Sequence, residues 1–113
     1  MNEQPKVSEA MVQKSILEWL RVRGIFAWRN NTGAVRIEGA TRSRFVRYGT
    51  PGSSDILGCL PDGRFLAIEC KSPTGRPTRD QLLFIKEIRD RGGVGFIARS
   101  LEDAIAELED ICR

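Results

Sequence analysis

The stretch DILGCLPDGRFLAIECK, residues 55–71, decides the fold of this chain. It contains two apolar runs, 55–60 and 64–71, on either side of the turn Pro61-Asp62-Gly63. An Asp-Gly pair between two apolar runs is a strong sequence signal for a β-hairpin. With the centre of the turn near residue 62, the residue numbers of antiparallel partners sum to about 124. We therefore expect a central hairpin of two paired strands.

Three charged side chains gather at the open end of this expected hairpin. The register opposes Asp55 to Glu69 on one face of the sheet, and Lys71 shares that face. Two carboxylates about 4–5 Å apart repel by roughly 3–4 kcal/mol at an effective dielectric constant of about 20, so a positive charge should lie between them. Lys71 could supply it as a local ion pair. The sharper alternative is Mg²⁺, which binds oxygen ligands and keeps several waters, held by Asp55, Glu69 and the backbone carbonyl of Cys70.

The composition removes most other catalytic chemistry. The chain has no histidine, which excludes Ser-His-Asp hydrolysis, Cys-His nucleophilic catalysis and nucleases that use histidine as a general base. Its three cysteines show no Cys-x-x-Cys spacing and cannot form a zinc site without histidine partners. A metal held by the carboxylate pair could polarise a phosphodiester and lower the pKa of a bound water, while the adjacent lysine orients that water or stabilises charge.

The positive charge is concentrated in one segment. The formal net charge of the chain is only +3, but residues 21–50 carry seven arginines against Glu38 alone, whereas residues 101–113 carry an excess of acidic side chains. The planar guanidinium group of arginine suits phosphate recognition. The segment therefore indicates nucleic-acid binding, with a solvated surface as the open alternative.

The remaining patterns predict an α/β fold in which helices flank a mixed sheet. At 113 residues and 12.7 kDa, we expect a single domain over residues 1–113. The expected elements are a helix over 8–23 capped by Ser8, a strand over 25–28, an arginine-bearing hairpin over 34–38 and 44–48 that projects from the core, the strands 55–60 and 64–71, a helix opened by Thr78 and ended by Gly92, a strand over 94–98, and a last helix capped by Ser100.

Nothing in the sequence indicates a membrane protein. No apolar stretch of about 18 residues is present, and the N-terminal residues lack the basic-then-apolar pattern of a signal peptide. We therefore expect a cytoplasmic protein.

Taken together, these residues resemble the PD-(D/E)XK nuclease superfamily, and specifically its VRR-NUC branch. The resemblance lies in Gly52-Ser53-Ser54-Asp55, thirteen intervening residues and Glu69-Cys70-Lys71, with Glu9 and Gln13 on the first helix, the segment Trp28-Arg29-Asn30-Asn31-Thr32-Gly33, and Gln81 opening a later helix. Ser54 stands where the superfamily's name has proline, which is often absent in this branch.

The resemblance implies a restriction-endonuclease-like fold of core order αβββαβ, here with an extra β-hairpin after the first strand and a C-terminal helix. It implies a DNA endonuclease that depends on Mg²⁺ or Mn²⁺. Stand-alone members resemble homodimeric resolvases that act on branched DNA such as Holliday junctions, and the small size fits a phage origin. The alternative is an accessory protein that binds nucleic acid and retains the fold without turnover.

The resemblance also implies roles for individual residues. Asp55, Glu69 and the Cys70 carbonyl would be metal ligands and Lys71 the catalytic lysine. Glu9 would face the metal, or it simply favours the positive end of its helix. Gln81 would act beside the active site, although Thr78-x-x-Gln81 is also a capping box in its own right.

The expected DNA contacts are polar side chains of the basic segment and of one later loop, each with solvated surface as its alternative. They are Arg29, Asn30, Asn31, Arg36, Arg42, Arg44, Arg47 and Arg76. Trp19 and Trp28 are expected in the core.

Overall fold

The computed structural model describes residues 6–31 and 33–111 of the chain. Its helices and strands follow the predicted order. They are α1 (Glu9–Val22), β1 (Phe26–Arg29), β2 (Gly33–Glu38), β3 (Ser43–Tyr48), β4 (Ile56–Cys59), β5 (Phe65–Cys70), α2 (Arg79–Asp90), β6 (Val94–Ala98) and α3 (Leu101–Leu108). The predicted α/β class, including the extra hairpin and the C-terminal helix, is confirmed.

The main sheet is mixed, as expected. Its strand order is β1-β4-β5-β6, with β4 antiparallel to both β1 and β5 and with β6 parallel to β5. Ile56 pairs with Ile68 and Cys59 with Phe65, so the register predicted from the Asp-Gly turn is confirmed. The open end of this central hairpin is therefore the end at which Asp55 and Glu69 lie.

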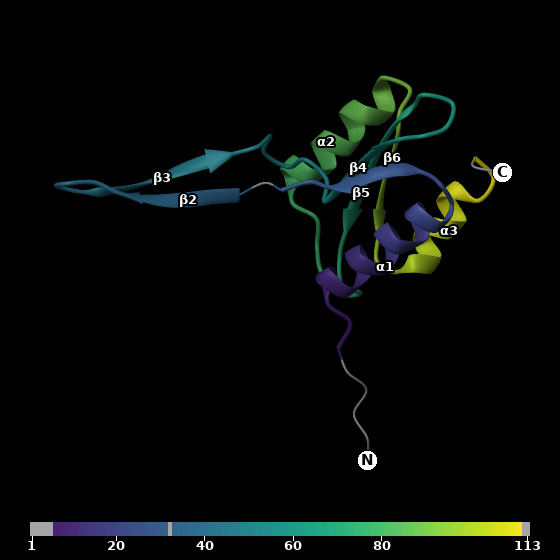
Figure 1. Ribbon diagram of the computed structural model, residues 1–113, viewed down its shortest axis with the longest axis horizontal. Coiled ribbons are helices and arrows are strands. Elements are labelled where there is room, and N and C mark those ends of the chain that lie inside the picture. The colour runs from purple at the N-terminus through teal and green to yellow at the C-terminus, as the bar shows by residue number, and fades with distance from the viewer. Residues whose placement is uncertain (1–5, 32, 112–113) are drawn as a thin grey trace, which may run out of the picture.

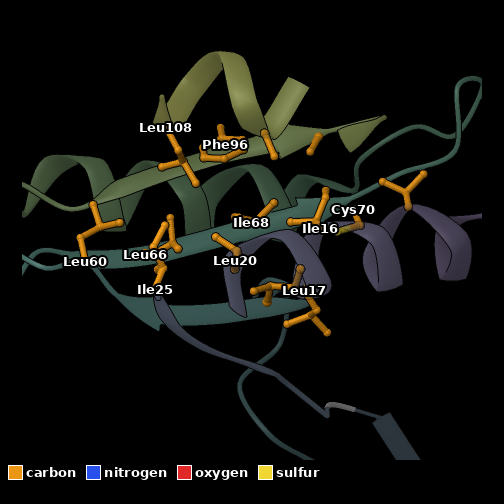
Figure 2. Close-up of a cluster of buried hydrophobic side chains, with 14 residues drawn as sticks. Ile16, Leu17, Leu20, Ile25, Leu60, Leu66, Ile68, Cys70, Phe96 and Leu108 are labelled. Carbon is orange, nitrogen blue, oxygen red and sulfur yellow. The ribbon is translucent and has the colours of Figure 1, made fainter. Parts of the chain in front are cut away.

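Helices cover both faces of the sheet (Figure 1). On one face, α1 and α3 pack together over the fully buried side chains Leu66 and Ile68 of β5. Ile16 and Leu20 of α1 point into this core, and Leu108 of α3 joins it from the other helix (Figure 2). On the other face, α2 covers β5 and β6. Because the even-numbered residues of β5 fill the first core, its odd-numbered residues, including Glu69, belong to the α2 face.

The predicted helix starts are confirmed by their caps. The hydroxyl of Ser8 accepts a hydrogen bond from the amide of Met11 at 3.2 Å, and Ser100 accepts one from Asp103 at 3.2 Å. Each bond satisfies an amide that has no partner within the first turn of its helix. These local contacts fix where α1 and α3 begin.

The β2–β3 hairpin forms a separate two-stranded sheet, which we call the arm. It extends away from the body of the molecule, as predicted (Figure 1). The longest dimension of the described structure is 57 Å and its radius of gyration is 16.2 Å, compared with about 13 Å for a compact domain of this length. The excess reflects the projecting arm.

Trp28 is not in the core, so that prediction is wrong, whereas Trp19 packs against the core as expected. Trp28 is 41% exposed and lies beside Phe26, with 5.3 Å between the ring centroids. Trp28 is exposed because β1 is an edge strand of the sheet. The helix on the same face as Trp28 is α2, which covers β5 and β6 at the other edge.

No helix among the described residues is long and apolar enough to cross a membrane. Residues 1–5, part of the segment in which no signal-peptide pattern was found, lie outside the described residues.

Gly52 offers a test of how closely the loop before β4 packs on α2. Its φ is +75°, and a Cβ at this position would lie 2.4 Å from the carbonyl oxygen of Asp80. Gly24 has a similar φ of +72°, but a Cβ there would meet nothing within 4 Å. We expect Gly24→Ala to lower the free energy of unfolding by about 1–2 kcal/mol, through its backbone conformation alone. Gly52→Ala should lower it clearly more. If urea unfolding gave the same loss for both variants, the close packing at Gly52 would be contradicted.

Candidate active site

Asp55 and Glu69 meet at the open end of the β4–β5 hairpin. Asp55 immediately precedes β4, and its carboxylate oxygen Oδ2 accepts a hydrogen bond of 2.9 Å from the backbone amide of Cys70. Its backbone carbonyl accepts a second bond of 2.7 Å from the amide of Asn30, which follows β1. Asp55 is thus tied to both strands that flank β4, and its carboxylate is held against the end of β5.

Glu69 is a buried carboxyl group with an unsatisfied oxygen. It is 2% exposed, and its Oε2 has no hydrogen-bond partner among the described residues. Burial, together with the neighbouring Asp55 carboxylate, raises the pKa of Glu69 to about 8. Both effects disfavour the negative charge, whereas Lys71 partly offsets them. A cation at this point would remove the penalty of burying that charge.

Lys71 links the carboxylate pair to the first helix. Its side chain is only 10% exposed, and its Nζ lies 3.6 Å from Oε1 of Glu69 and 3.3 Å from Oε1 of Glu9. The backbone amide of Lys71 donates to the carbonyl of Ala98 at 3.0 Å, which continues the β5–β6 ladder beyond the end of β5. The predicted local ion pair is therefore present. Glu9 reaches the site through this lysine.

The donor set suits a hard cation that retains water ligands. Among residues 6–31 and 33–111, no three Asp, Glu, His or Cys side chains are close enough to hold a metal ion between them. Any metal here would bind two carboxylates, a backbone carbonyl and water, a set of oxygen ligands that Mg²⁺ accepts. The unpartnered Glu69 Oε2 fits this arrangement.

The thiol of Cys70 takes no part in the site. The side chain is fully buried within the hydrophobic core, on the opposite face from Glu69. Burial raises the pKa of this thiol, with a further contribution from the Asp55 carboxylate. A thiol that stays protonated is a poor metal ligand, so only the backbone of Cys70 is suited to the predicted role.

Asn30 braces the loop that carries Asp55. Its side-chain nitrogen donates to the hydroxyl of Ser53 at 2.7 Å and to the carbonyl of Ser54 at 3.1 Å. We predicted Asn30 as a DNA contact. In the structure its side-chain nitrogen is bonded to the loop before β4. Asn31, the next residue toward the arm, is exposed.

Gln81 forms the capping box at the start of α2. Its side-chain oxygen accepts from the amide of Thr78 at 2.9 Å, and the Thr78 hydroxyl accepts from the amide of Gln81 at 3.2 Å. The capping alternative is thus confirmed, and a catalytic role stays a prediction. Gly52 packs directly on the backbone of Asp80, so the first turn of α2 lies against the loop that carries Asp55.

The structure separates the predicted DNA-binding arginines into three places. Arg29 lies in a groove of about 340 Å³ beside α1, together with Lys14 and Arg21. Arg76 is exposed in the loop that follows Lys71. The others are exposed on the arm: Arg36, Arg42, Arg44 and Arg47.

Arg99 is a residue of the site region that the sequence did not reveal. Its guanidinium Nη1 donates to the carbonyls of Ser72, Pro73 and Gly75, at 2.8, 3.4 and 2.5 Å. These carbonyls belong to the turn directly after Lys71. The backbone amide of Arg99 donates to the carboxylate of Asp103 at 2.8 Å. Arg99 therefore fixes the turn after Lys71 to the start of α3, and no local motif announces contacts that are 24–27 residues apart in the chain.

The fold and the site together define the class of protein. It is a restriction-endonuclease-like α/β domain in which Asp55 and the sequence Glu69-Cys70-Lys71 form a site of the PD-(D/E)XK type. The family model described as the VRR-NUC domain matches residues 7–101, and the chain belongs to this family. It is also similar to a protein of Acyrthosiphon pisum secondary endosymbiont phage 1 named "Putative nuclease p44". The two are 42% identical over 48 residues, which cover 42% of this chain and 52% of the phage protein. The match thus spans about half the length of that relative.

The pH dependence of stability tests the burial of Glu69. The pKa of Glu69 is raised from 4.5 to about 8 in the folded protein, so the folded state retains a proton that the unfolded state has lost. The stabilisation that this retained proton gives the folded state is complete below pH 4.5 and is lost as the pH rises through 8. Between these values the free energy of unfolding falls by up to about 1.4 kcal/mol per pH unit. Urea unfolding between pH 5 and 9 in EDTA should show this loss in the wild type but not in Glu69→Gln. The control Glu18→Gln alters an exposed carboxyl group and should match the wild type. Identical profiles for all three proteins would contradict the buried carboxylate.

The contacts of Arg99 predict a loss of order in the turn after Lys71. Removing bonds to its carbonyls should speed amide hydrogen exchange at Gly75, whose amide donates within that turn to the carbonyl of Ser72. We expect at least a tenfold increase in Arg99→Ala, since the variant loses three hydrogen bonds worth about 1 kcal/mol each, and about 1.4 kcal/mol already corresponds to a factor of ten. Arg91→Ala, which removes an exposed arginine paired with Glu87, is the control and should leave Gly75 unchanged. Unchanged exchange in Arg99→Ala would show that the turn is held by other contacts.

Proposed function

We propose that this protein is a DNA endonuclease that hydrolyses phosphodiester bonds and depends on Mg²⁺ or Mn²⁺. The observation that carries the proposal is the convergence of Asp55, Glu69 and Lys71 at one end of the β4–β5 hairpin. Membership of the VRR-NUC family and the name of the phage relative support a nuclease. The proposed metal dependence rests on the chemistry of the donor set, and the choice of DNA as substrate rests on the resemblance to the PD-(D/E)XK nucleases.

The proposed metal ligands are Asp55, Glu69 and the backbone carbonyl of Cys70. When bound, the cation would polarise the scissile phosphate and lower the pKa of a water ligand. Asp55 is oriented for this role by the amide of Cys70, and Glu69 by its position within β5. Glu69 therefore sits on a rigid strand, and Asp55 lies directly before β4 and is hydrogen-bonded to the end of β5. Both carboxylates are thus held more precisely than on a free loop.

Lys71 would supply a positive charge at the site in addition to that of the bound cation. Its ammonium group lies between Glu69 and Glu9, from where it can orient the attacking water or stabilise the charge that develops on the phosphate. Glu9 is half exposed and holds the ammonium from the solvent side. We assign Glu9 a positioning role for Lys71, with metal ligation as the alternative.

Branched DNA such as a Holliday junction is the proposed substrate, and a homodimer is the proposed active form. The family resemblance supports both. A two-fold dimer would pair two active sites for two strands. Sedimentation velocity tests the dimer, because a single species of 12.7 kDa would contradict it. Since the relative is a phage protein, we also propose that the enzyme acts on DNA in the cytoplasm of a host cell.

Cleavage assays on junction, flap and linear duplex DNA test the proposed chemistry. With Mg²⁺ or Mn²⁺ we expect cutting, fastest on the junction, and none in EDTA. Asp55→Ala and Glu69→Ala should abolish it. Lys71→Ala should retain metal binding by calorimetry but lower kcat by about 10²–10³, the usual effect of removing one charge-stabilising group.

The exposed residue Glu107 provides the control, since Glu107→Ala should cut at the wild-type rate. Cutting that persists in both Asp55→Ala and Glu69→Ala would place catalysis elsewhere. A wild type that binds DNA with no metal-dependent cutting of any substrate would favour the non-catalytic accessory protein.

A further inference from the structure

The arm is rooted directly beside the proposed active site. Asn30 precedes the arm and Ser53 follows it, and their side chains bond to each other at 2.7 Å. The amide of Asn30 also donates to the carbonyl of Asp55. The two roots of the arm are thus clamped together next to a proposed metal ligand, while the arm itself extends away from the body (Figure 1).

The arm also holds the net positive charge of the chain. Residues 33–48 contain four arginines and one glutamate, a formal net charge of +3, which equals that of the whole chain and leaves the rest neutral. The arginines are exposed. Glu38 is the single acidic side chain of the arm, and it lies 3.4 Å from Arg36. The arm is therefore suited to an extended anionic partner.

One face of the arm combines arginine with an exposed aromatic ring. Arg36 pairs with Phe45 across the two strands, and the Arg36 guanidinium lies 5.8 Å from the centroid of that ring. Arg47 is two residues from Phe45 on the same strand and so shares its face. Phe45 is 71% exposed. This face therefore combines positive charge with an apolar ring, a composition that suits contact with the edges of DNA bases.

We propose that the arm lies as a β-ribbon in the major groove of a DNA duplex that runs outward from the active site. The proposal rests on the proposed function, because it assumes that this site receives DNA. The major groove is about 12 Å wide and admits a two-stranded ribbon. Arginine can bond to the major-groove edge of guanine, and apolar side chains such as phenylalanine contact the methyl group of thymine. The face with Arg36, Phe45 and Arg47 meets the bases.

The other arginines of the arm fit the sugar–phosphate backbone at the sides of the groove. Arg44 pairs with Ile37 on the opposite face, and Arg42 lies at the tip, where Gly39 donates its amide to the carbonyl of Arg42. Six residues of strand span roughly 20 Å, the length of about six base pairs of duplex. The enzyme therefore requires double-stranded DNA on the arm side of the cleavage site.

The first test compares two double variants of the full chain. Binding of a 20-base-pair duplex is measured by fluorescence anisotropy over a series of salt concentrations in EDTA, so that no cutting occurs. Arg36→Ala/Arg47→Ala should bind about tenfold more weakly, or worse, because both arginines meet bases. The slope of log K against log salt should fall by less than about 2, the change expected for two lost phosphate contacts. The control Arg64→Ala/Arg91→Ala removes two arginines near the turn at the opposite end of the β4–β5 hairpin and should match the wild type. Equal affinity of all three proteins would overturn the proposal.

The second test uses the wild type alone and distinguishes the groove from the phosphates. The same duplex is prepared with glucosylated 5-hydroxymethylcytosine, whose sugar fills the major groove and leaves the phosphates unaltered. We expect the wild type to lose about tenfold in affinity and the arm variant to bind both duplexes alike. Equal binding of both duplexes by the wild type would overturn major-groove binding. Neither test uses cleavage, so an inactive enzyme would contradict the proposed function and leave this inference standing.

Discussion

The burial of Glu69 beside Asp55 is the constraint on which the rest of the structure depends. A buried carboxyl group next to a second carboxylate is costly in its ionised form, and here one oxygen of Glu69 has no partner within the described residues. Strand β5 directs its even-numbered side chains into the core beneath α1 and α3, so Glu69 lies on the opposite face of the sheet. The same strand thus anchors the core and holds the charged site.

Support for this site comes from every layer of the fold. The start of α1 contributes Glu9, which meets the ammonium group of Lys71. Arg99, after β6, secures the turn that follows this lysine. The first turn of α2 lies against Gly52 in the loop before β4. Elements that are distant in the chain therefore restrain the three charged side chains, and precise placement of such groups is what catalysis by positioning requires.

The body and the arm divide the physical tasks of the molecule. The body has balanced charge and a conventional apolar core, whereas the arm carries the net charge, and none of its residues whose burial is described belongs to that core. An isolated two-stranded ribbon is at most marginally stable in water. An arm bound in the groove would pack against the DNA instead of against the body. The hydrogen bond between Asn30 and Ser53 at its base would keep the arm in a fixed position relative to Asp55.

The order of the elements, the register of the central hairpin and the helix caps follow from the sequence alone, because turn chemistry, side-chain alternation and capping act between residues that are close in the chain. The meeting of Asp55 with Glu69 follows from the same register. Arg99, the bracing role of Asn30 and the exposure of Trp28 do not, since each depends on which strands become neighbours and which face a helix covers. The sequence by itself determined the chemistry available at one strand end. Only the tertiary structure decided which distant side chains restrain it, because those contacts form when separate elements pack together.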